Sequence, residues 1–368
     1  MMDEKIKYYD LLIKNKFLQR ILFVLFDIVL KTIRFIIKII PLEKKSVCVI
    51  SIHKLGDSIF TFDAINSIKE YFGEQVFIIC NIDSVPIYEM IHKKEYLIPV
   101  PREYFHFGDR YLDRRARKLL SSLKPKTIID LTGVMTSASL IFKSRASAII
   151  GFNRRIFKGI YNNFREFQLG KHSREIYINA IKEIIPITEF NKTIESTNNS
   201  DRILIAPFAG WISKEWSLVK FIELAELLKE KLNVWLILDN RKINEEILNY
   251  LKVKKIDFVR TKSVSELINE IKNCKLLIGN DSGPVQIAAL LGKHTFSIYG
   301  PTNPDFHLPK GNKHSFIQKK LPCSPARNER LCFTDGGKNG CPAFECLHQI
   351  TVEQVYKQII SNIIVNKS

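Results

Sequence analysis

Acidic residues are scarce in this chain of 368 residues, because Asp and Glu number 38 against 56 Lys and Arg. The formal net charge of +18 favours an anionic partner: nucleic acid, an acidic membrane surface, or a phosphorylated or carboxylated substrate. A compositional bias toward Lys, Ile and Asn is the alternative explanation. The content of 46% hydrophobic and 26% charged residues excludes a disordered chain and is typical of a folded globular protein.

Cysteine is sparse as well, and the 7 cysteines include no CxxC pair. An odd number of cysteines in so long a chain argues against a secreted disulfide framework and favours a reduced, cytosolic compartment. Four of them, Cys323, Cys332, Cys341 and Cys346, gather toward the end of the chain. A zinc site and packing as small apolar side chains are both open for these four, and their spacing favours packing without a metal.

An apolar run that is long enough to span a membrane and free of charge is missing near the amino terminus. Residues 16–40 are mostly apolar, but they carry six charges within an arc of roughly 60° on a helix. Those charges argue against a spanning helix, and a signal-peptide cleavage site is also missing. The pattern predicts an amphipathic helix lying on an anionic membrane, with packing on the protein's own core or on a second subunit as the alternative. The six residues are Lys16, Arg20, Asp27, Lys31, Arg34 and Lys38.

Beyond Pro41, short apolar strands alternate with amphipathic helices, which indicates mostly parallel α/β sheets. The polar stretch at 184–201 indicates a linker, so we expect a basic helical segment at 1–45, domains at 46–192 and 193–350, and a closing helix at 351–368. The predicted strands are 47–52, 76–80, 127–131, 148–152, 203–206, 234–238, 276–279 and 295–299. The predicted helices are 58–72, 218–232, 243–251, 284–291 and 351–365.

The segment after the first predicted strand carries a candidate catalytic carboxylate. Gly56 allows a tight turn without a Cβ in the way of a ligand, and Asp57 stands at the start of the next helix. In open α/β sheets, ligands bind at this carboxyl end of the strands. Asp57 is therefore either an ordinary N-cap or a general base for a substrate hydroxyl, with Lys54 and Gly56 beside the bound acceptor.

A second passage from strand to helix, at Asp281, Ser282 and Gly283, is suited to a phosphate. Free backbone N–H groups and the helix dipole attract anions there, and the glycine lets a pyrophosphate approach closely. Gly300 and Thr302 follow the next predicted strand and are expected on the same rim. Two such sites far apart in the chain suggest two domains that face one cleft, one holding an acceptor and the other a phosphorylated donor.

Basic side chains complete the candidate site. Lys214, in the loop before residue 218, is placed to set a point charge against a departing diphosphate, although a lone loop lysine is usually just solvated. Arg110, Arg114 and Arg145 are suited to bidentate capture of carboxylates or phosphates on an acidic acceptor. A solvated helix face is the alternative explanation for some of these arginines.

Six short motifs follow one another along the chain. They are His53-Lys54-Leu55-Gly56-Asp57, Asp130-Leu131-Thr132-Gly133, Arg145 with Gly151-Phe152, Lys214-Glu215-Trp216, Asp281-Ser282-Gly283-Pro284 and Tyr299-Gly300-Pro301-Thr302. Each is modest alone, but in this order they resemble the heptosyltransferase family that builds the inner core of lipopolysaccharide. The resemblance covers about residues 47–365, and the cysteine-bearing tail before a final helix is also similar.

The resemblance implies a GT-B fold of two Rossmann-like domains. It implies inverting, metal-independent transfer of a sugar from a nucleotide diphosphate, by family default ADP-heptose, to an anionic lipid-linked saccharide, without a cofactor. On this resemblance Asp57 matches the general base, and Lys214 matches the lysine that neutralises the leaving diphosphate. Asp281, Ser282 and Gly283 match the donor-binding turn. Such an enzyme is expected in the cytoplasm, peripheral on the inner face of the cytoplasmic membrane through residues 16–40.

Two departures from the family pattern leave the donor open. Gln286 stands where the family commonly has histidine, and we expect its amide to contact the donor without carrying a charge. Asp239-Asn240-Arg241 replaces a glycine-rich turn near the nucleoside. One alternative is therefore a GT-B transferase that uses another nucleotide sugar in capsule or glycan assembly. A second is a non-catalytic protein that binds nucleic acid or another anionic polymer, for which no nucleic-acid motif is found.

Overall fold

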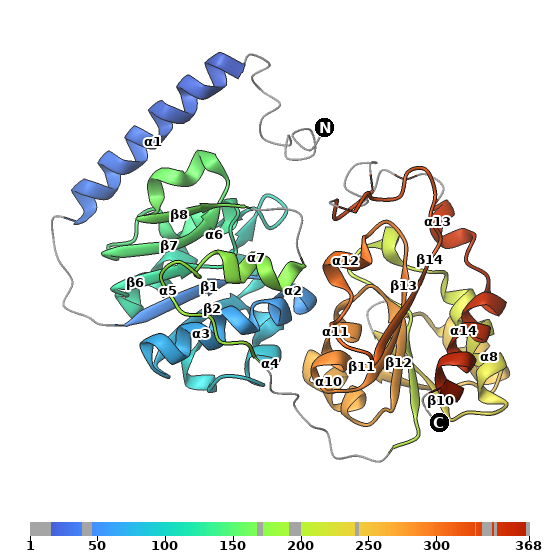
Figure 1. Ribbon diagram of the computed structural model, residues 1–368. Coiled ribbons are helices and arrows are strands. Elements are labelled where there is room, and N and C mark those ends of the chain that lie inside the picture. The colour runs from blue at the N-terminus through green and yellow to red at the C-terminus, as the bar shows by residue number, and fades with distance from the viewer. Residues whose placement is uncertain are drawn as a thin grey trace. The chain divides into compact units, whose positions relative to one another are not determined.

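The computed structural model describes residues 16–38, 46–167, 172–190, 200–239, 243–327, 329–332, 341 and 344–365. These residues divide into two compact units (Figure 1). Unit 1 holds the described residues of Met1–Gln168 and Ser173–Phe190, and unit 2 holds those of Leu169–His172 and Asn191–Ser368. Half of the predicted linker, residues 191–199, lies outside the described residues.

Unit 1 is built on a parallel six-stranded sheet with the order β3-β2-β1-β6-β7-β8. The strand order reverses between β1 and β6, which pair in register from Val47 with Thr127 to Ile50 with Asp130. The carboxyl ends of these two strands therefore form a topological switch point. The strands are β1 (Val47–Ser51), β2 (Val76–Asn81), β3 (Leu97–Val100), β6 (Thr127–Asp130), β7 (Ala148–Asn153) and β8 (Asn163–Glu166), with a separate antiparallel pair β4 (Phe105–His106) and β5 (Tyr111–Leu112).

The helices of unit 1 occupy the connections between its strands. The predicted helix 58–72 is in fact two helices, which meet at Thr61, where the hydroxyl donates a 2.7 Å hydrogen bond to the Ser58 carbonyl. The elements are α1 (Lys16–Lys38), α2 (Leu55–Phe60), α3 (Phe62–Phe72), η2 (Ile82–Ser84), α4 (Val85–Tyr88), η3 (Lys94–Tyr96), η4 (Arg102–Tyr104), α5 (Arg114–Leu123), α6 (Met135–Ile141), η5 (Arg155–Ile160) and α7 (Ser173–Asn179).

Unit 2 repeats the same topology, with the order β11-β10-β9-β12-β13-β14 and a switch point between β9 and β12. Its strands are β9 (Ile203–Ala206), β10 (Val234–Asp239), β11 (Asp257–Thr261), β12 (Leu276–Asn280), β13 (His294–Tyr299) and β14 (His314–Gln318). Its helices are η6 (Ile212–Lys214), α8 (Leu218–Lys229), α9 (Glu245–Val253), α10 (Val264–Lys272), α11 (Gly283–Leu290), α12 (Pro304–His307), α13 (Glu345–His348) and α14 (Val352–Val365), and α14 packs on α8.

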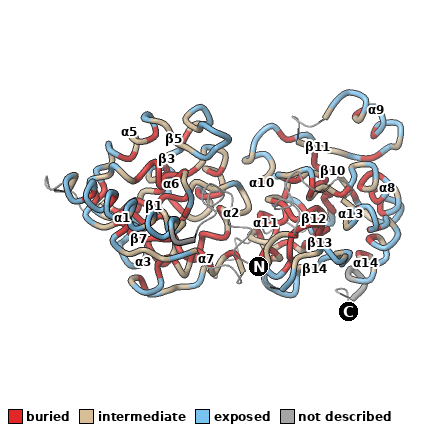
Figure 2. The backbone as a smooth tube through the Cα atoms, turned by 90° about the horizontal axis from the view of Figure 1, so that it is seen from above, coloured by how far each residue is buried: buried red, intermediate tan, exposed pale blue. Residues whose placement is uncertain are grey.

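The central strands form the cores of both units, as Figure 2 shows by burial. Every residue of β1, β9 and β12 is buried, because helices cover both faces of a parallel sheet. That is why these strands are near-continuous apolar runs and were predicted from the sequence. The outer strands β3, β8, β11 and β14 were not predicted, since charged, polar or proline residues interrupt them.

Helix α1, labelled in Figure 1, packs on η5 of unit 1 through the side that carries Asp27, Leu30 and Arg34. Arg34 is 5% exposed and donates hydrogen bonds to the carbonyls of Ser144 and Ala146, the latter at 2.7 Å. Leu30 is buried beside it, while most apolar residues of the helix are exposed. The predicted amphipathic helix is therefore present, and packing on the protein accounts for Arg34 in its polar stripe but not for the exposed Arg20 and Lys31. Among the described residues, none of the helices combines the length and apolarity needed to cross a membrane.

A glycine in β7 tests how closely two central strands of unit 1 must approach. Gly151 has φ of +146°, and a Cβ there would lie 2.3 Å from the carbonyl oxygen of Asp130 on β6. We expect Gly151→Ala to lower the free energy of unfolding by about 3 kcal/mol or more, because both backbone strain and displacement of β6 are required. Urea unfolding measures this change.

Gly73 provides the matched control, because it has φ of +88° but open space where a Cβ would lie. Gly73→Ala should lower the free energy of unfolding by only about 1 kcal/mol, the strain of the left-handed backbone alone. Equal losses in the two variants would contradict the close approach of β6 and β7.

Candidate functional site

The candidate base Asp57 lies in the first turn of α2, directly after the carboxyl end of β1. The N-cap of α2 is Lys54, and Asp57 makes no capping hydrogen bond. The alternative that Asp57 is an ordinary N-cap is therefore wrong. Asp57 is half-buried, and no described residue donates a hydrogen bond to its carboxylate. Gly56 belongs to the same helical turn and has no positive φ, so the expected special turn at this glycine is also wrong.

The loop after β6, the second loop at this edge of the sheet, is stabilised by the buried carboxylate of Asp130. Asp130 accepts hydrogen bonds from the N–H groups of Thr132 at 2.9 Å and Gly133 at 3.2 Å. The Tyr161 hydroxyl donates to its other oxygen at 2.5 Å. Burial raises the pKa of Asp130 to about 6, although Tyr161 and the two N–H groups act in the opposite direction. Asp130 thus shapes the loop and is not exposed to a ligand.

The two loops are joined to each other directly. The Thr132 hydroxyl accepts a 2.9 Å hydrogen bond from the Ile52 N–H, and a ring nitrogen of His53 lies 3.0 Å from the Leu131 carbonyl. The motif that carries Asp57 is therefore positioned by the loop after β6. His53 was not predicted to be a site residue. The only signal in the sequence for its role is its position directly after the predicted strand 47–52.

The arginines expected at the acceptor are divided between two edges of the sheet. Arg110 and Arg114 are exposed in the connection that leaves the carboxyl end of β3, and Arg114 begins α5. Arg145 is exposed in the loop that enters β7. Because the strands are parallel, that loop lies at the amino edge, opposite to Asp57. The prediction that Arg145 shares the acceptor site is wrong on this topology.

In unit 2 the structure brings Lys214 and Asp281 together at the switch point. Lys214 ends η6, after β9, and Asp281 follows β12. The Lys214 ammonium lies 2.7 Å from Asp281 Oδ2, and it also lies 4.7 Å from the centre of the Trp211 ring. Burial raises the pKa of Asp281, but the positive charge of Lys214 and then His307 outweigh it and hold that pKa at about 2. The lysine is thus a fixed cation and not a solvated one.

Ser282 and Gly283 begin helix α11 beside this ion pair. Ser282 takes the N-cap position with an extended backbone, yet its side chain makes no capping bond. Among the described residues its buried Oγ has no hydrogen-bond partner. Ser297 Oγ and Tyr299 OH on β13 likewise find no partner in the described part of the chain, and the Thr302 hydroxyl, in the turn after β13, helps to lower the pKa of Asp281. Buried hydroxyls are normally paired, so the Ser282 hydroxyl at the start of α11 is suited to bind water or a polar ligand.

Two residues assigned to donor binding have structural roles instead. Gln286 is 5% exposed and its amide donates a 2.6 Å hydrogen bond to the His307 carbonyl, which ties α11 to α12. Gly300 is buried, and a Cβ there would lie 2.8 Å from Leu347 of α13. The expectation that the Gln286 amide contacts the donor is therefore wrong, because that amide donates to the His307 carbonyl, and the glycine at 300 is explained by packing.

The four cysteines near the end of the chain line one cavity of about 360 Å³ next to Gly300. Cys323 is exposed, Cys332 is buried, and Cys341 and Cys346 are half-buried. Burial, followed by the neighbouring thiols, raises the pKa of Cys346 to about 11. Within the described ranges no group of three or more His, Cys, Asp or Glu side chains is arranged to hold a metal ion.

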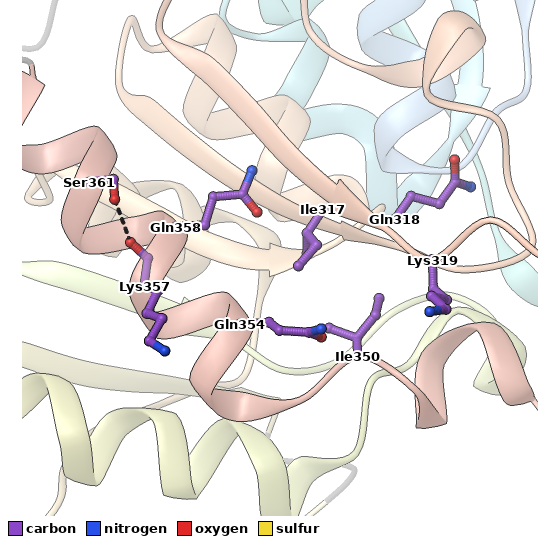
Figure 3. A pocket seen from close by; sticks show the side chains of 8 residues that line it. All are labelled: Ile317, Gln318, Lys319, Ile350, Gln354, Lys357, Gln358 and Ser361. Atoms are coloured by element: carbon purple, nitrogen blue, oxygen red, sulfur yellow. Dashed lines mark hydrogen bonds between the residues drawn. The ribbon is translucent and has the colours of Figure 1, made fainter.

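A second cavity, of about 430 Å³, lies between β14 and α14 (Figure 3). Ile317 and Ile350 form its apolar part, and Gln354, Gln358 and Lys357 lie along the α14 side. None of the predicted site residues lines it. The cavity lies beside the edge strand β14, away from the switch point between β9 and β12. We therefore place the candidate site of unit 2 at Lys214 and Asp281 and not at this cavity.

Two Rossmann-like sheets, each with polar residues at its switch point, define an α/β enzyme of the nucleotide-binding class. The chain is similar to the structure of E. coli heptosyltransferase WaaC with ADP, at a TM-score of 0.63 and 15% identity, covering 86% of this chain and 99% of that one. This likeness confirms the predicted GT-B fold. Residues 115–334, more than half of the chain, match glycosyltransferase family 9 (heptosyltransferase), and the protein belongs to that family.

Known relatives agree with this assignment. Lipooligosaccharide heptosyltransferase 2 of Campylobacter jejuni is 23% identical over 328 residues, which cover 83% of this chain and 94% of the relative. The match to lipooligosaccharide heptosyltransferase 2 of Haemophilus influenzae is 27% identical but spans only 29% of this chain and 33% of that relative. The predicted family and the class of glycosyltransferase are confirmed, and the non-catalytic alternative is left without support.

The buried Asp130 generates a prediction for stability against pH. Its folded pKa of about 6 exceeds the ordinary 3.8, so the neutral carboxyl stabilises the fold below about pH 4. That stabilisation, about 3 kcal/mol for two pKa units, is lost as the pH rises through 6. Asp130→Asn should remove this dependence. Urea unfolding from pH 4 to 7 should show wild type losing about 3 kcal/mol relative to the variant.

Tyr161→Phe is the companion variant, since it removes a donor that holds the pKa of Asp130 down. The pH at which stability falls should then move upward. A difference between wild type and Asp130→Asn that stays constant over this pH range would contradict the raised pKa.

Proposed function

We propose that the protein transfers a heptosyl group from ADP-heptose to a lipid-linked saccharide of the lipopolysaccharide inner core, with inversion at the anomeric carbon. The observation that carries the proposal is the buried Lys214–Asp281 ion pair at the start of α11, in a member of glycosyltransferase family 9. The WaaC structure contains ADP, which supports an adenine nucleotide as the donor here.

On the donor side, Lys214 supplies the positive charge and α11 supplies N–H groups. Asp281 holds the ammonium at the rim, so little side-chain entropy is lost when the diphosphate arrives. The Ser282 hydroxyl, which has no hydrogen-bond partner among the described residues, and the first N–H groups of α11 bind phosphate oxygens. As the bond from the anomeric carbon to the phosphate oxygen breaks, negative charge grows on the diphosphate, and Lys214 stabilises it.

On the acceptor side, Asp57 accepts the proton of the attacking hydroxyl while the new bond to the anomeric carbon forms. Its half-buried position, with no hydrogen-bonded partner in the part of the chain that the structure describes, supports this role, because a carboxylate engaged elsewhere would be a weaker base. Lys54, Arg110 and Arg114 are exposed cations at the same edge of the sheet and bind acidic groups of the acceptor. A single displacement of this kind needs no covalent intermediate and gives the inverted product.

We further propose that the enzyme works in the cytoplasm, peripheral on the inner face of the cytoplasmic membrane. A lipid-linked acceptor stays in the bilayer, so its enzyme must work at the interface. The net charge of +18 and the exposed apolar residues of α1 support this location.

The donor prediction concerns the nucleotide and Lys214. ADP should raise the melting temperature more than UDP or GDP at equal concentration, as linkage requires for the nucleotide bound most tightly. Lys214→Gln should weaken ADP binding by about tenfold to a hundredfold, because a charge-assisted contact is lost. Calorimetric titration measures the affinity. Lys262→Gln, an exposed lysine in the loop after β11, is the control and should bind ADP like wild type.

Stronger stabilisation by UDP or GDP would favour the alternative of a capsule or glycan transferase with another nucleotide sugar. Unchanged ADP affinity in Lys214→Gln would remove this lysine from the diphosphate site, whichever base is preferred.

The acceptor prediction concerns Asp57. Asp57→Asn should lower kcat about 10²- to 10⁴-fold, the range for loss of a general base, while donor affinity stays the same. The rate of ADP formation from ADP-heptose and a saturating lipid-linked acceptor measures kcat, and calorimetry measures donor affinity. Asp83→Asn, at a surface carboxylate after β2 that pairs with Arg102, is the matched control. Undiminished turnover in Asp57→Asn would exclude Asp57 as the base.

A further inference from the structure

The proposed sugar transfer makes no use of the exposed apolar face of α1. Six of its side chains are each more than half exposed, and on a helix they span an arc of about 140°. Thr32 is the one polar residue within that arc among residues 18–37, and its hydroxyl is taken up by the Ile28 carbonyl at 2.9 Å. An exposed apolar surface of this extent marks an interaction site. The six residues are Val24, Leu25, Ile28, Val29, Phe35 and Ile36.

The opposite face of α1 is fixed to unit 1, so the helix is not a loose tether. Arg34 is buried with two backbone carbonyls as acceptors, and Leu30 is 8% exposed. A Cβ on Gly159 of η5 would lie 2.7 Å from the Asp27 carbonyl, which shows how closely the helix backbone approaches. An amphipathic helix normally buries its apolar side on the protein. Here the side that meets the protein carries Asp27, Leu30 and Arg34, and the broad apolar face is left exposed.

Exposed cations surround this helix. Arg20 and Lys31 lie on α1 at the border of the apolar arc, and both are exposed. The segments that hold α1 add more: the loop with the Arg34 acceptors contains Arg145, and η5 contains Arg155 and Lys158, all exposed. Arg145, which is displaced from the acceptor edge, belongs to this basic surrounding. Apolar side chains bordered by Lys and Arg match the acyl chains and acidic head groups of one leaflet.

We infer that α1, held by Arg34, lies in the plane of an anionic membrane with its apolar face among the acyl chains, and so orients unit 1 on the bilayer. This inference deepens the proposed membrane location. The proposed lipid-linked acceptor explains why such an orientation would be useful, but the observations on α1 do not depend on it. A second copy of the chain fits less well, because a two-helix seam uses a narrower stripe and the cations of both copies would repel.

The experiment measures vesicle binding of the full chain without nucleotide or acceptor. Wild type should float with vesicles of phosphatidylcholine and phosphatidylglycerol, and more weakly with phosphatidylcholine alone. Ile28→Glu with Phe35→Glu should lower the partition coefficient about tenfold or more on both vesicles. Arg20→Gln with Lys31→Gln should lower it only on the anionic vesicles. Val253→Glu, an equally exposed apolar residue on α9 of unit 2, is the control and should bind like wild type.

Sugar transfer to a water-soluble acceptor fragment, measured in the same variants, should stay at the wild-type rate. This readout separates the two proposals, since loss of transfer with intact vesicle binding would count against the transferase mechanism only. Failure of the wild-type protein to bind anionic vesicles would overturn the inference. So would a wild-type dimer, seen by light scattering, that becomes monomeric in Ile28→Glu with Phe35→Glu while neither protein binds vesicles.

Discussion

The ion pair between Lys214 and Asp281 is the interaction on which the donor half of the protein depends. Both side chains are largely buried at the rim of a sheet, where an unpaired charge would be destabilising by several kcal/mol. An aspartate next to a phosphate site is unfavourable by itself, because it repels the ligand. Its presence is explained if its task is to hold the lysine. A flexible ammonium becomes a fixed one, so that the proposed diphosphate donor would meet a positive charge that is already in place.

The same kind of arrangement recurs in unit 1 with different chemistry. Asp130 is buried and engaged by Tyr161 and backbone N–H groups, so it fixes the loop after β6. That loop in turn binds the segment that leads to Asp57 through Thr132 and His53. In both units a buried carboxylate at a switch point positions a neighbouring group. Asp130 acts through the loop after β6 on the segment that carries Asp57, and Asp281 holds Lys214; Asp57 and Lys214 are the groups proposed to touch substrate.

The sequence predicted the parts of this fold that burial determines. Central strands such as β1 and β12 are apolar over most of their length because they are covered on both faces. Polar and charged residues interrupt β8 and β14, which therefore gave no such signal. At the candidate site, the place of Asp57 and Lys214 after strands could be read from the sequence, whereas their proposed roles came from the family resemblance and stay predictions. Gln286 was misassigned, because its partner His307 lies on another helix and no spacing in the chain indicates that contact.

The helix α1 shows the limit of periodicity most clearly. Its pattern defines a polar stripe and an apolar face, but it does not indicate which side packs on the protein. The orientation is determined by Arg34, whose guanidinium donates hydrogen bonds to two carbonyls of one loop, and by Gly159, which allows the backbones of α1 and η5 to approach closely. Docking through Arg34 leaves the apolar side of the helix exposed, and contact of that side with water is unfavourable. The proposed membrane location therefore requires a phase that covers it. An anionic leaflet meets that requirement with the charges already present around the helix.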